Sequence, residues 1–271
     1  MNAATAASHA LDMNAIGYFY LPAASLHDEA VLHRYRAKIT KCQIFMIGLR
    51  PAVKLEHVRE DSGKMIATFS VLGQKYEPQW PIPAGFSLRQ EKGAWTLVNE
   101  AGKRMFPYSE SMMGRLHEEF VKLDFNVLYI GQVFGGPGAR HAIEQLRKSD
   151  LVPKLREQTP EGYRLEILLL EMAGDPETRF DAEDAELITL CEAALIKHFR
   201  PAHNMGSDGS FPSTKPRMLR GCAGRGIESI RARSAFEELP FRIFSDVVAP
   251  AVEQEARIDL SGGDAARTFF G

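Results

Sequence analysis

Residues 191–204 read CEAALIKHFRPAHN and hold the most informative pattern in the chain. On a helical wheel, the apolar side chains in and just before this stretch form one arc, made of Ile188, Cys191, Ala194, Leu195 and Phe199. Glu192 falls inside the edge of that arc, where a carboxylate loses much of its water and needs a metal ion, a cation or a hydrogen-bond donor to stay charged. Because Pro201 cannot continue a helix, the sequence predicts a helix over residues 182–199.

A second pattern lies upstream, where residues 127–132 read VLYIGQ, a short apolar strand containing Tyr-Ile-Gly. The Glu-x2-Leu-Ile-x4-Pro-x2-Asn pattern from Glu192 to Asn204 follows it after about sixty residues. In this order and at this separation, the two patterns resemble the GIY-YIG nuclease superfamily. The resemblance covers residues 120–205. It implies a mixed α/β nuclease core in the middle of the chain.

The resemblance also implies roles for individual residues. In that family a strand tyrosine and a helix arginine act on the scissile phosphate, and the glutamate holds one divalent cation. By position, these roles point to Tyr129 as a catalytic residue and to Glu192 as both a catalytic residue and the ligand of one Mg²⁺ or Mn²⁺ ion. Asn204 is expected to make a structural or phosphate-side contact.

The family arginine and the first family strand are less clear in this chain. The arginine position holds Gln145, and Ser149 stands where a His or Tyr is usual. Arg140, on the same face of a helix about one turn earlier, is the expected substitute, with His141 as an accessory proton carrier. The Gly-Ile-Tyr strand is expected just before YIG, but residues 117–126 read HEEFVKLDFN and contain no tyrosine.

A basic stretch follows the helix. Between Arg200 and Arg233 there are seven basic residues against Asp208 and Glu228, a local charge of +5 in a chain whose net charge is −2. Next to the expected site, such a stretch favours contact with a phosphate backbone; the alternative is a solvated, flexible loop. The expected nucleic-acid contacts are Arg200, Asn204, Lys215, Arg217, Arg220 and Arg225.

Length and composition indicate the size of the core, the cellular compartment and the absence of a membrane partner. A chain of 271 residues, 45% hydrophobic and 25% charged, can bury a full core. The three cysteines show no zinc-site spacing, which favours a reducing, cytoplasmic location. The first fifteen residues have no basic segment followed by an apolar one, and no apolar run is long enough to span a bilayer, so neither a signal peptide nor a membrane partner is expected.

The pattern of strands and helices predicts the α+β class and three segments. Apolar runs at 43–49, 64–71, 86–90 and 94–98 indicate a β-rich N-terminal domain over residues 1–110. Residues 111–205 alternate strands with helices, typical of a mixed α/β core, the GIY-YIG-like nuclease domain. Residues 206–271 form the basic loop and a small C-terminal β element, with strands at 227–233, 241–247 and 256–260.

These observations favour a metal-dependent endonuclease that hydrolyses phosphodiester bonds, with DNA favoured over RNA as the substrate. The first alternative is a catalytically degenerate module that binds nucleic acid or a protein partner through the same fold. A structural module whose glutamate is merely buried and paired is a more remote alternative. A homo-oligomer is compatible with each of these interpretations.

Overall fold

The computed structural model of this chain describes residues 9–91, 94–105, 116–133, 142–174, 184–206, 219, 227–235 and 239–260. Its helices are η1 (Ala23–His27), α1 (Glu29–Ile39), η2 (Leu116–Phe120), α3 (Ala142–Lys148), α4 (Leu151–Glu157) and α5 (Asp184–Phe199). Its strands are β1 (His9–Pro22), β2 (Ile44–Pro51), β3 (Val53–Asp61), β4 (Lys64–Val71), β5 (Gln74–Tyr76), β6 (Gln79–Pro81), β7 (Phe86–Glu91), β8 (Ala94–Asn99), β9 (Arg104–Met105), β10 (Phe125–Gln132), β11 (Tyr163–Gly174), β12 (Ile227–Ala235), β13 (Ile243–Phe244) and β14 (Glu253–Asp259).

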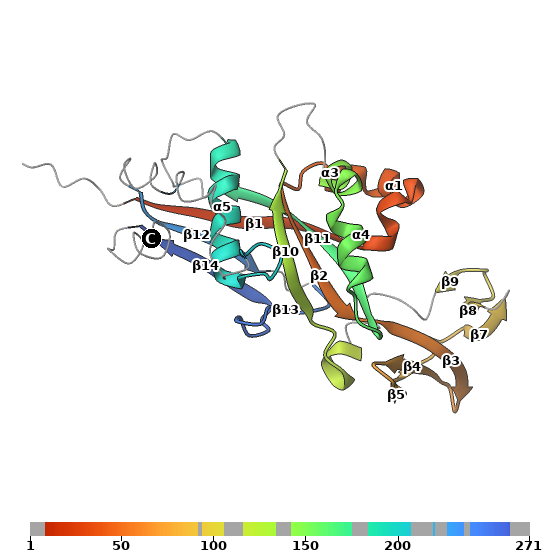
Figure 1. Ribbon diagram of the computed structural model, residues 1–271. Coiled ribbons are helices and arrows are strands. Elements are labelled where there is room, and N and C mark those ends of the chain that lie inside the picture. The colour runs from red at the N-terminus through yellow and green to blue at the C-terminus, as the bar shows by residue number, and fades with distance from the viewer. Residues whose placement is uncertain are drawn as a thin grey trace, which may run out of the picture.

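A seven-stranded sheet forms the centre of the molecule, in the order β13-β10-β2-β11-β1-β12-β14 (Figure 1). The strands β10, β2, β11 and β1 pair antiparallel in turn, whereas β12 lies parallel to β1. Both β2 and β11 are buried along almost their whole length. Near-continuous apolar runs are typical of strands covered on both faces, which explains why these two lie in the middle of the sheet.

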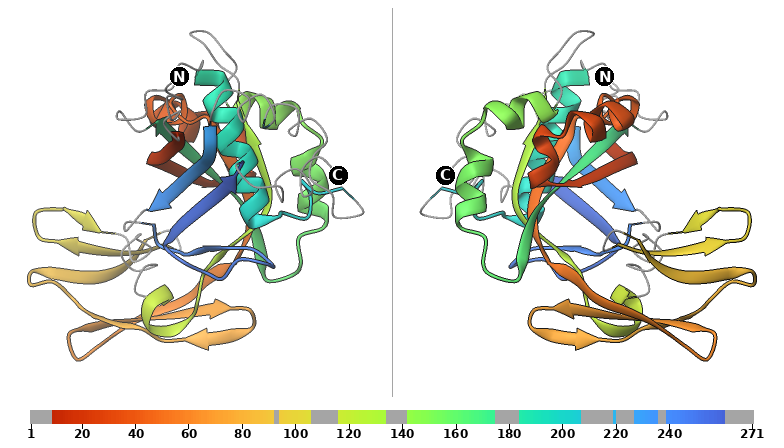
Figure 2. Two further views of the ribbon diagram at one scale, coloured as in Figure 1. Left: turned by 90° about the vertical axis from the view of Figure 1, so that its left-hand side faces the viewer. Right: turned by 90° about the vertical axis from the view of Figure 1, so that its right-hand side faces the viewer.

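Helix α5 covers one face of the sheet and contacts β10, β12 and β14 (Figure 2). Its residues 188–196 and Phe199 are all buried, so the helix is enclosed on nearly every side and not only along one arc. The two edges of the sheet meet beneath it, because Ile243 of β13 bridges to Ala251, just before β14. The Gln254 amide donates to the Ile243 carbonyl at 2.8 Å. The sheet therefore curls around α5.

The other face of the sheet is covered by η1, α1, α3 and α4, which share a second core with β2 and β11. Helix α1 begins at Asp28, whose carboxylate accepts hydrogen bonds from the amides of Ala30 and Val31 at 3.0 and 3.1 Å. Only Leu32 and Ile39 of α1 are buried. This helix therefore adds little to the core and presents most of its surface to solvent.

Residues 53–105 form two small sheets that extend away from the central sheet (Figure 1). One has the order β3-β4-β5 with β6 also on β4, and the other has the order β7-β8-β9. A core of their own, which includes Phe69, Trp80 and Leu116, holds them together. β3 follows β2 after the single residue Ala52. The strand-rich segment therefore separates β2 from β10 in the sequence, although the two strands are neighbours in the central sheet.

The α+β class predicted from the sequence is confirmed. The central sheet takes strands from all three predicted segments, so the boundaries predicted at residues 110 and 205 fall within one structural unit. It takes β1 and β2 from the first segment and β12 and β14 from the last. The physical reason is β1: it supplies a hydrogen-bonding edge to β11 on one side and to β12 on the other. The sequence does not predict this strand, because a bulge between Ala15 and Gly17 interrupts its apolar alternation.

Some other predicted elements are shorter in the structure. Of the strand expected over 241–247, only Ile243–Phe244 is a strand, and β14 runs over Glu253–Asp259.

Within the part of the chain that the structure describes, no helix is long and apolar enough to cross a membrane.

Candidate functional site

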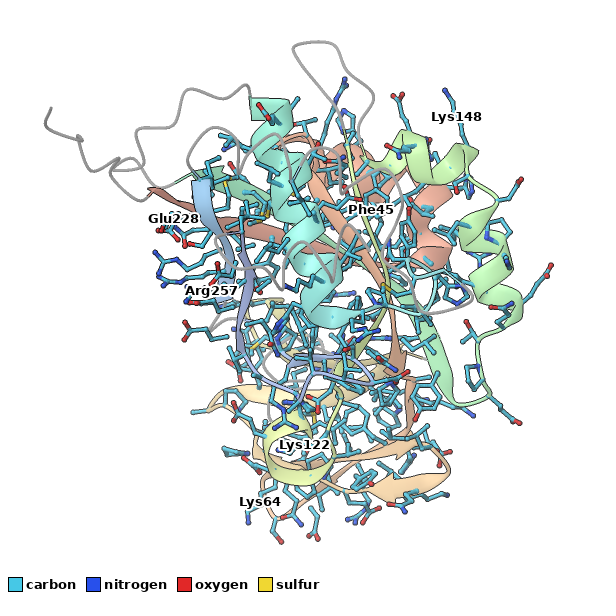
Figure 3. All side chains as sticks on the ribbon, turned by 60° about the vertical axis from the view of Figure 1, so that its left-hand side comes forward. Phe45, Lys64, Lys122, Lys148, Glu228 and Arg257 are labelled. Carbon is cyan, nitrogen blue, oxygen red and sulfur yellow. The ribbon has the colours of Figure 1, made fainter. Side chains whose placement is uncertain are left out.

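Tyr129 lies on β10, and its position depends on a neighbouring strand that is distant in sequence. β10 pairs antiparallel with β2, and the register shifts at a bulge between Val127 and Tyr129. Bulges re-aim side chains, and they are frequent next to active sites. The half-buried Tyr129 ring stacks on Phe45 of β2, with ring centroids 6.0 Å apart. Phe45 is labelled in Figure 3, where it lies in the packed interior.

Glu192 lies in the middle of α5, with only 6% of its surface exposed. Its neighbours Cys191 and Ala193 are buried as well, so the enclosed helix accounts for the burial of the carboxylate. Burial raises the pKa of Tyr129, and the negative charge of Glu192 raises it further. Tyr129 packs with Phe45 against the core under α1, α3 and α4, whereas α5 covers the opposite face of the sheet. The effect of the Glu192 charge on the Tyr129 hydroxyl is therefore what links the two residues that the sequence predicts as partners.

The chain leaves α5 through a tight turn that returns it to β10. Arg200 has a left-handed backbone with φ of 45°, as is common just after a helix end, and its amide donates to Ile196 at 2.8 Å. Pro201 follows and is buried. Two residues later, the amide of His203 donates to the carbonyl of Leu128 on β10 at 3.1 Å. The segment after the helix therefore lies along the edge of β10.

Asn204 completes this contact with a two-sided hydrogen bond. Its Oδ1 accepts from the Ile130 amide at 2.7 Å, and its Nδ2 donates to the Ile130 carbonyl at 2.8 Å. The side chain thus binds the strand edge as a neighbouring strand would. Of the two roles expected for Asn204, the geometry shows the structural one, which fixes the YIG strand against the end of α5.

Replacing Asn204 with alanine is expected to lower the free energy of unfolding by about 2 kcal/mol, because the Ile130 amide and carbonyl lose their partner in a partly buried place. The measurement is urea unfolding followed by circular dichroism. Asn99→Ala is the matched control, since Asn99 accepts one bond from the Lys103 amide in an exposed turn. Equal losses in the two variants would contradict the structural role of Asn204.

His203 and Lys154 add polar groups near the end of β10. Burial lowers the pKa of His203, and the positive charge of Lys154 on α4 lowers it further. A histidine with a lowered pKa is neutral at neutral pH and can accept a proton. Lys154 is exposed and supplies a cation on the face of the sheet covered by α4.

Most of the expected cationic residues lie outside the described residues. Those are Arg140, His141, Lys215, Arg217, Arg220 and Arg225. Arg200 is described, and it is exposed at the end of α5. On α3, Gln145 is exposed, whereas Arg147 binds the Leu26 carbonyl and Glu29, both at 2.6 Å, and so fixes η1 to the start of α1.

Among the described residues, no group of three or more His, Cys, Asp or Glu side chains lies together. Mg²⁺ accepts a single carboxylate together with water and phosphate oxygens. Glu192 would be the protein ligand of such an ion, and this role stays a prediction from the sequence.

A titration can test the proximity of Tyr129 and Glu192 without any activity assay. Glu192→Gln removes the negative charge, so the pKa of Tyr129 is expected to fall while burial keeps it above its ordinary value. The readout is the ultraviolet absorbance of the phenolate as pH rises, and Tyr129→Phe identifies the step that belongs to this residue. Glu60→Gln, an exposed change on β3, serves as the control. An unmoved Tyr129 step in Glu192→Gln would contradict the contact.

Comparison with protein families, with curated proteins and with solved structures finds no match to this chain.

The sequence analysis does not identify Phe45 or Lys154 as neighbours of the site. Residues 43–49 are predicted as a strand, but nothing in their sequence indicates that β2 pairs with β10 across the strand-rich segment. Lys154 is one of many basic residues in the chain, and only the packing of α4 places it near His203.

Proposed function

We propose that this chain is a metal-dependent endonuclease of the GIY-YIG type that acts on DNA. The observation that carries the proposal is that α5 packs on β10 and that Asn204, just after α5, binds β10 at Ile130, next to Tyr129. The charge of Glu192 on α5 also reaches Tyr129 on β10. These are the residues that the resemblance names, and they come from two elements that contact each other.

The arrangement of strands also supports the proposal. A first strand just before YIG would form a hairpin with it, and here β2 takes that place beside β10, with β11 on its other side. The strand-rich segment 53–105 then separates the two partners in sequence but not in space. This accounts for the missing Gly-Ile-Tyr pattern in residues 117–126.

The site suits phosphodiester hydrolysis. Attack of a water oxygen on phosphorus breaks the bond to the leaving oxygen, and both the phosphate and the departing alkoxide need charge stabilisation. A divalent cation held by Glu192 would supply that stabilisation. Because its pKa is raised, Tyr129 stays protonated at neutral pH and acts by positioning the water or the phosphate and not by taking its proton. Neutral His203, next to Asn204, is a candidate for accepting the proton.

A cleavage assay on the purified full chain tests the proposal. Supercoiled plasmid, duplex oligonucleotides and single-stranded oligonucleotides are incubated with Mg²⁺, Mn²⁺, Ca²⁺ or EDTA. We expect nicking or cutting with Mg²⁺ or Mn²⁺ and none with EDTA. RNA substrates in the same assay test the preference for DNA.

One observation favours the degenerate alternative. Phe45, beside Tyr129, brings no hydroxyl to the site, and Gln145 brings no charge. In the degenerate case the chain binds nucleic acid or a protein partner and cuts nothing with any metal, while Gln145→Arg introduces cutting. Binding of nucleic acid without cutting by the wild type would therefore support the binding-module alternative over the enzyme.

We place this function in the cytoplasm. Cys42 and Cys191 are buried free thiols, and burial raises the pKa of Cys42 to about 12. Free cysteines of this kind are usual in reducing compartments.

A further inference from the structure

Helix α1 and the residues just after it form a basic surface in a chain whose net charge is negative. Residues 29–41 contain four basic side chains and a single acid, Glu29, which is paired with Arg147 at 2.6 Å. The basic side chains are all exposed, and they are Arg34, Arg36, Lys38 and Lys41. Within the described part of the chain, the only ion pair among them is a loose 3.9 Å contact between Lys41 and Glu171. The charge of α1 is therefore available to a partner.

A groove with a volume of about 1010 Å³ lies between α1 and β1. Four aromatic residues line it, Tyr18, Phe19, Tyr20 and Tyr35, and Lys38, Lys41 and Glu171 stand at its side. Tyr18 and Tyr20 pack against the core under α5, so Phe19 and Tyr35 supply the rings on the α1 side. The Phe19 and Tyr35 rings lie 4.9 Å apart, so α1 and β1 contribute to one aromatic surface.

The groove follows a strand edge that has no strand beside it in the described residues. β12 pairs with β1 only as far as Asn14, whereas β1 continues to Pro22. The residues of β1 that line the groove begin at Ile16, beyond the end of this pairing, and 63% of the Ile16 surface is exposed. The groove is thus open along its length and holds both rings and positive charges.

We propose that α1 and this groove bind single-stranded nucleic acid, with the phosphates on Arg34, Lys38 and Lys41 and the bases against Tyr35 and Phe19. Basic side chains that follow a backbone, together with aromatic rings that stack on bases, are the two features of sequence-independent single-strand binding. The inference rests on the proposed function, since it gives the same substrate a second contact surface. It makes a single-stranded segment part of what the protein recognises.

The chemistry of the groove favours a single strand over a duplex or a peptide. In a duplex the base faces are stacked inside, so they do not reach Tyr35 or Phe19. An acidic peptide satisfies the positive charge but leaves the Phe19 and Tyr35 rings without planar partners. Bases and phosphates on one flexible chain match both features.

The surface also lies on the same side of the sheet as Tyr129. Helix α1 packs next to α3, and Ile39 and Ile143 belong to the core that Tyr129 joins together with Phe45 (Figure 1). A strand held on α1 therefore lies on the face of the sheet against which Tyr129 packs, opposite α5.

Binding of labelled oligonucleotides to the full chain, followed by fluorescence anisotropy in EDTA, tests the inference. The combined variant Arg34→Ala, Lys38→Ala and Lys41→Ala is expected to weaken binding of single-stranded DNA. The log–log salt slope should fall by about 0.7 for each lost phosphate contact. Tyr35→Ala is expected to weaken the same binding about five- to 150-fold with an unchanged slope, since it removes one stacked base.

Two controls match these changes. Lys54→Ala, Lys64→Ala and Lys103→Ala together remove the same charge from exposed sites in the strand-rich segment, where Figure 3 shows Lys64. Tyr163→Ala removes a ring of similar exposure, 39% against 36% for Tyr35. Equal losses in control and test variants overturn the inference, as does an unaffected Tyr35→Ala. Competition by an acidic peptide as strong as by the oligonucleotide overturns it in favour of a peptide at the strand edge.

The use of EDTA separates this inference from the proposed function. If α1 variants lose single-strand binding while the wild type never cuts, the binding surface stands and the nuclease fails. If the wild type cuts but the α1 variants bind and cut normally, the nuclease stands and the α1 surface is overturned.

Discussion

Glu192→Gln is expected to lower the rate of metal-dependent cleavage by at least about a hundredfold, because the neutral amide no longer balances a divalent cation at the scissile phosphate. The amide has the size of the carboxylate, so the enclosed helix α5 keeps its packing around a side chain that is only 6% exposed. The measurement is the initial rate of cutting over a range of Mg²⁺ and Mn²⁺ concentrations, with circular dichroism to compare the folds.

Thr189→Val is the matched control for this prediction. Thr189 is buried on the same helix, and its hydroxyl donates within the helix to the Ala185 carbonyl at 2.8 Å. Its loss changes a buried polar group of α5 without removing a carboxylate, so the cleavage rate is expected to stay close to that of the wild type. A Glu192→Gln rate equal to that of Thr189→Val would show that Glu192 holds no catalytic metal.

The sequence predicts the parts of the site that depend on local patterns. The apolar spacing of residues 188–199 predicts α5 and the partial burial of Glu192, and Pro201 predicts where the helix ends. The structure adds that α5 is buried on nearly all sides, since the sheet curls around it. A helical wheel shows only one apolar arc and cannot show how far a sheet will close.

The parts that the sequence does not predict are those set by distant pairing. Phe45 meets Tyr129 only because β2 pairs with β10 after the long interruption by residues 53–105. The groove beside α1 depends on where β12 stops pairing with β1, which a turn or a charge pattern does not reveal. The basic residues of α1 are visible in the sequence, but alone they are equally typical of a solvated helix face.

Arg50→Met is expected to lower the free energy of unfolding by about 3 kcal/mol, because it breaks a buried ion pair. Arg50 and Glu166 are 3% and 1% exposed, and their Nη1 and Oε2 atoms lie 2.8 Å apart. The guanidinium also donates to the Leu123 carbonyl at 2.9 Å and lies 4.1 Å from the centre of the Phe241 ring. This side chain therefore links β2 and β11 to the segments just before β10 and β13, where the strand-rich segment joins the sheet.

The size of the loss follows from what the substitution leaves behind. Methionine fills much of the space, but Glu166 then keeps only Arg164, whose Nε lies 2.7 Å from it and whose side chain is 32% exposed. Arg59→Met is the control, since its ion pairs on β3 are exposed and worth less than about 1 kcal/mol. Urea unfolding compares the two variants. The double variant Arg50→Met with Glu166→Leu is expected to recover much of the loss, because no unpaired charge stays buried. A double variant as unstable as Arg50→Met would instead assign the loss to the contacts with Leu123 and Phe241.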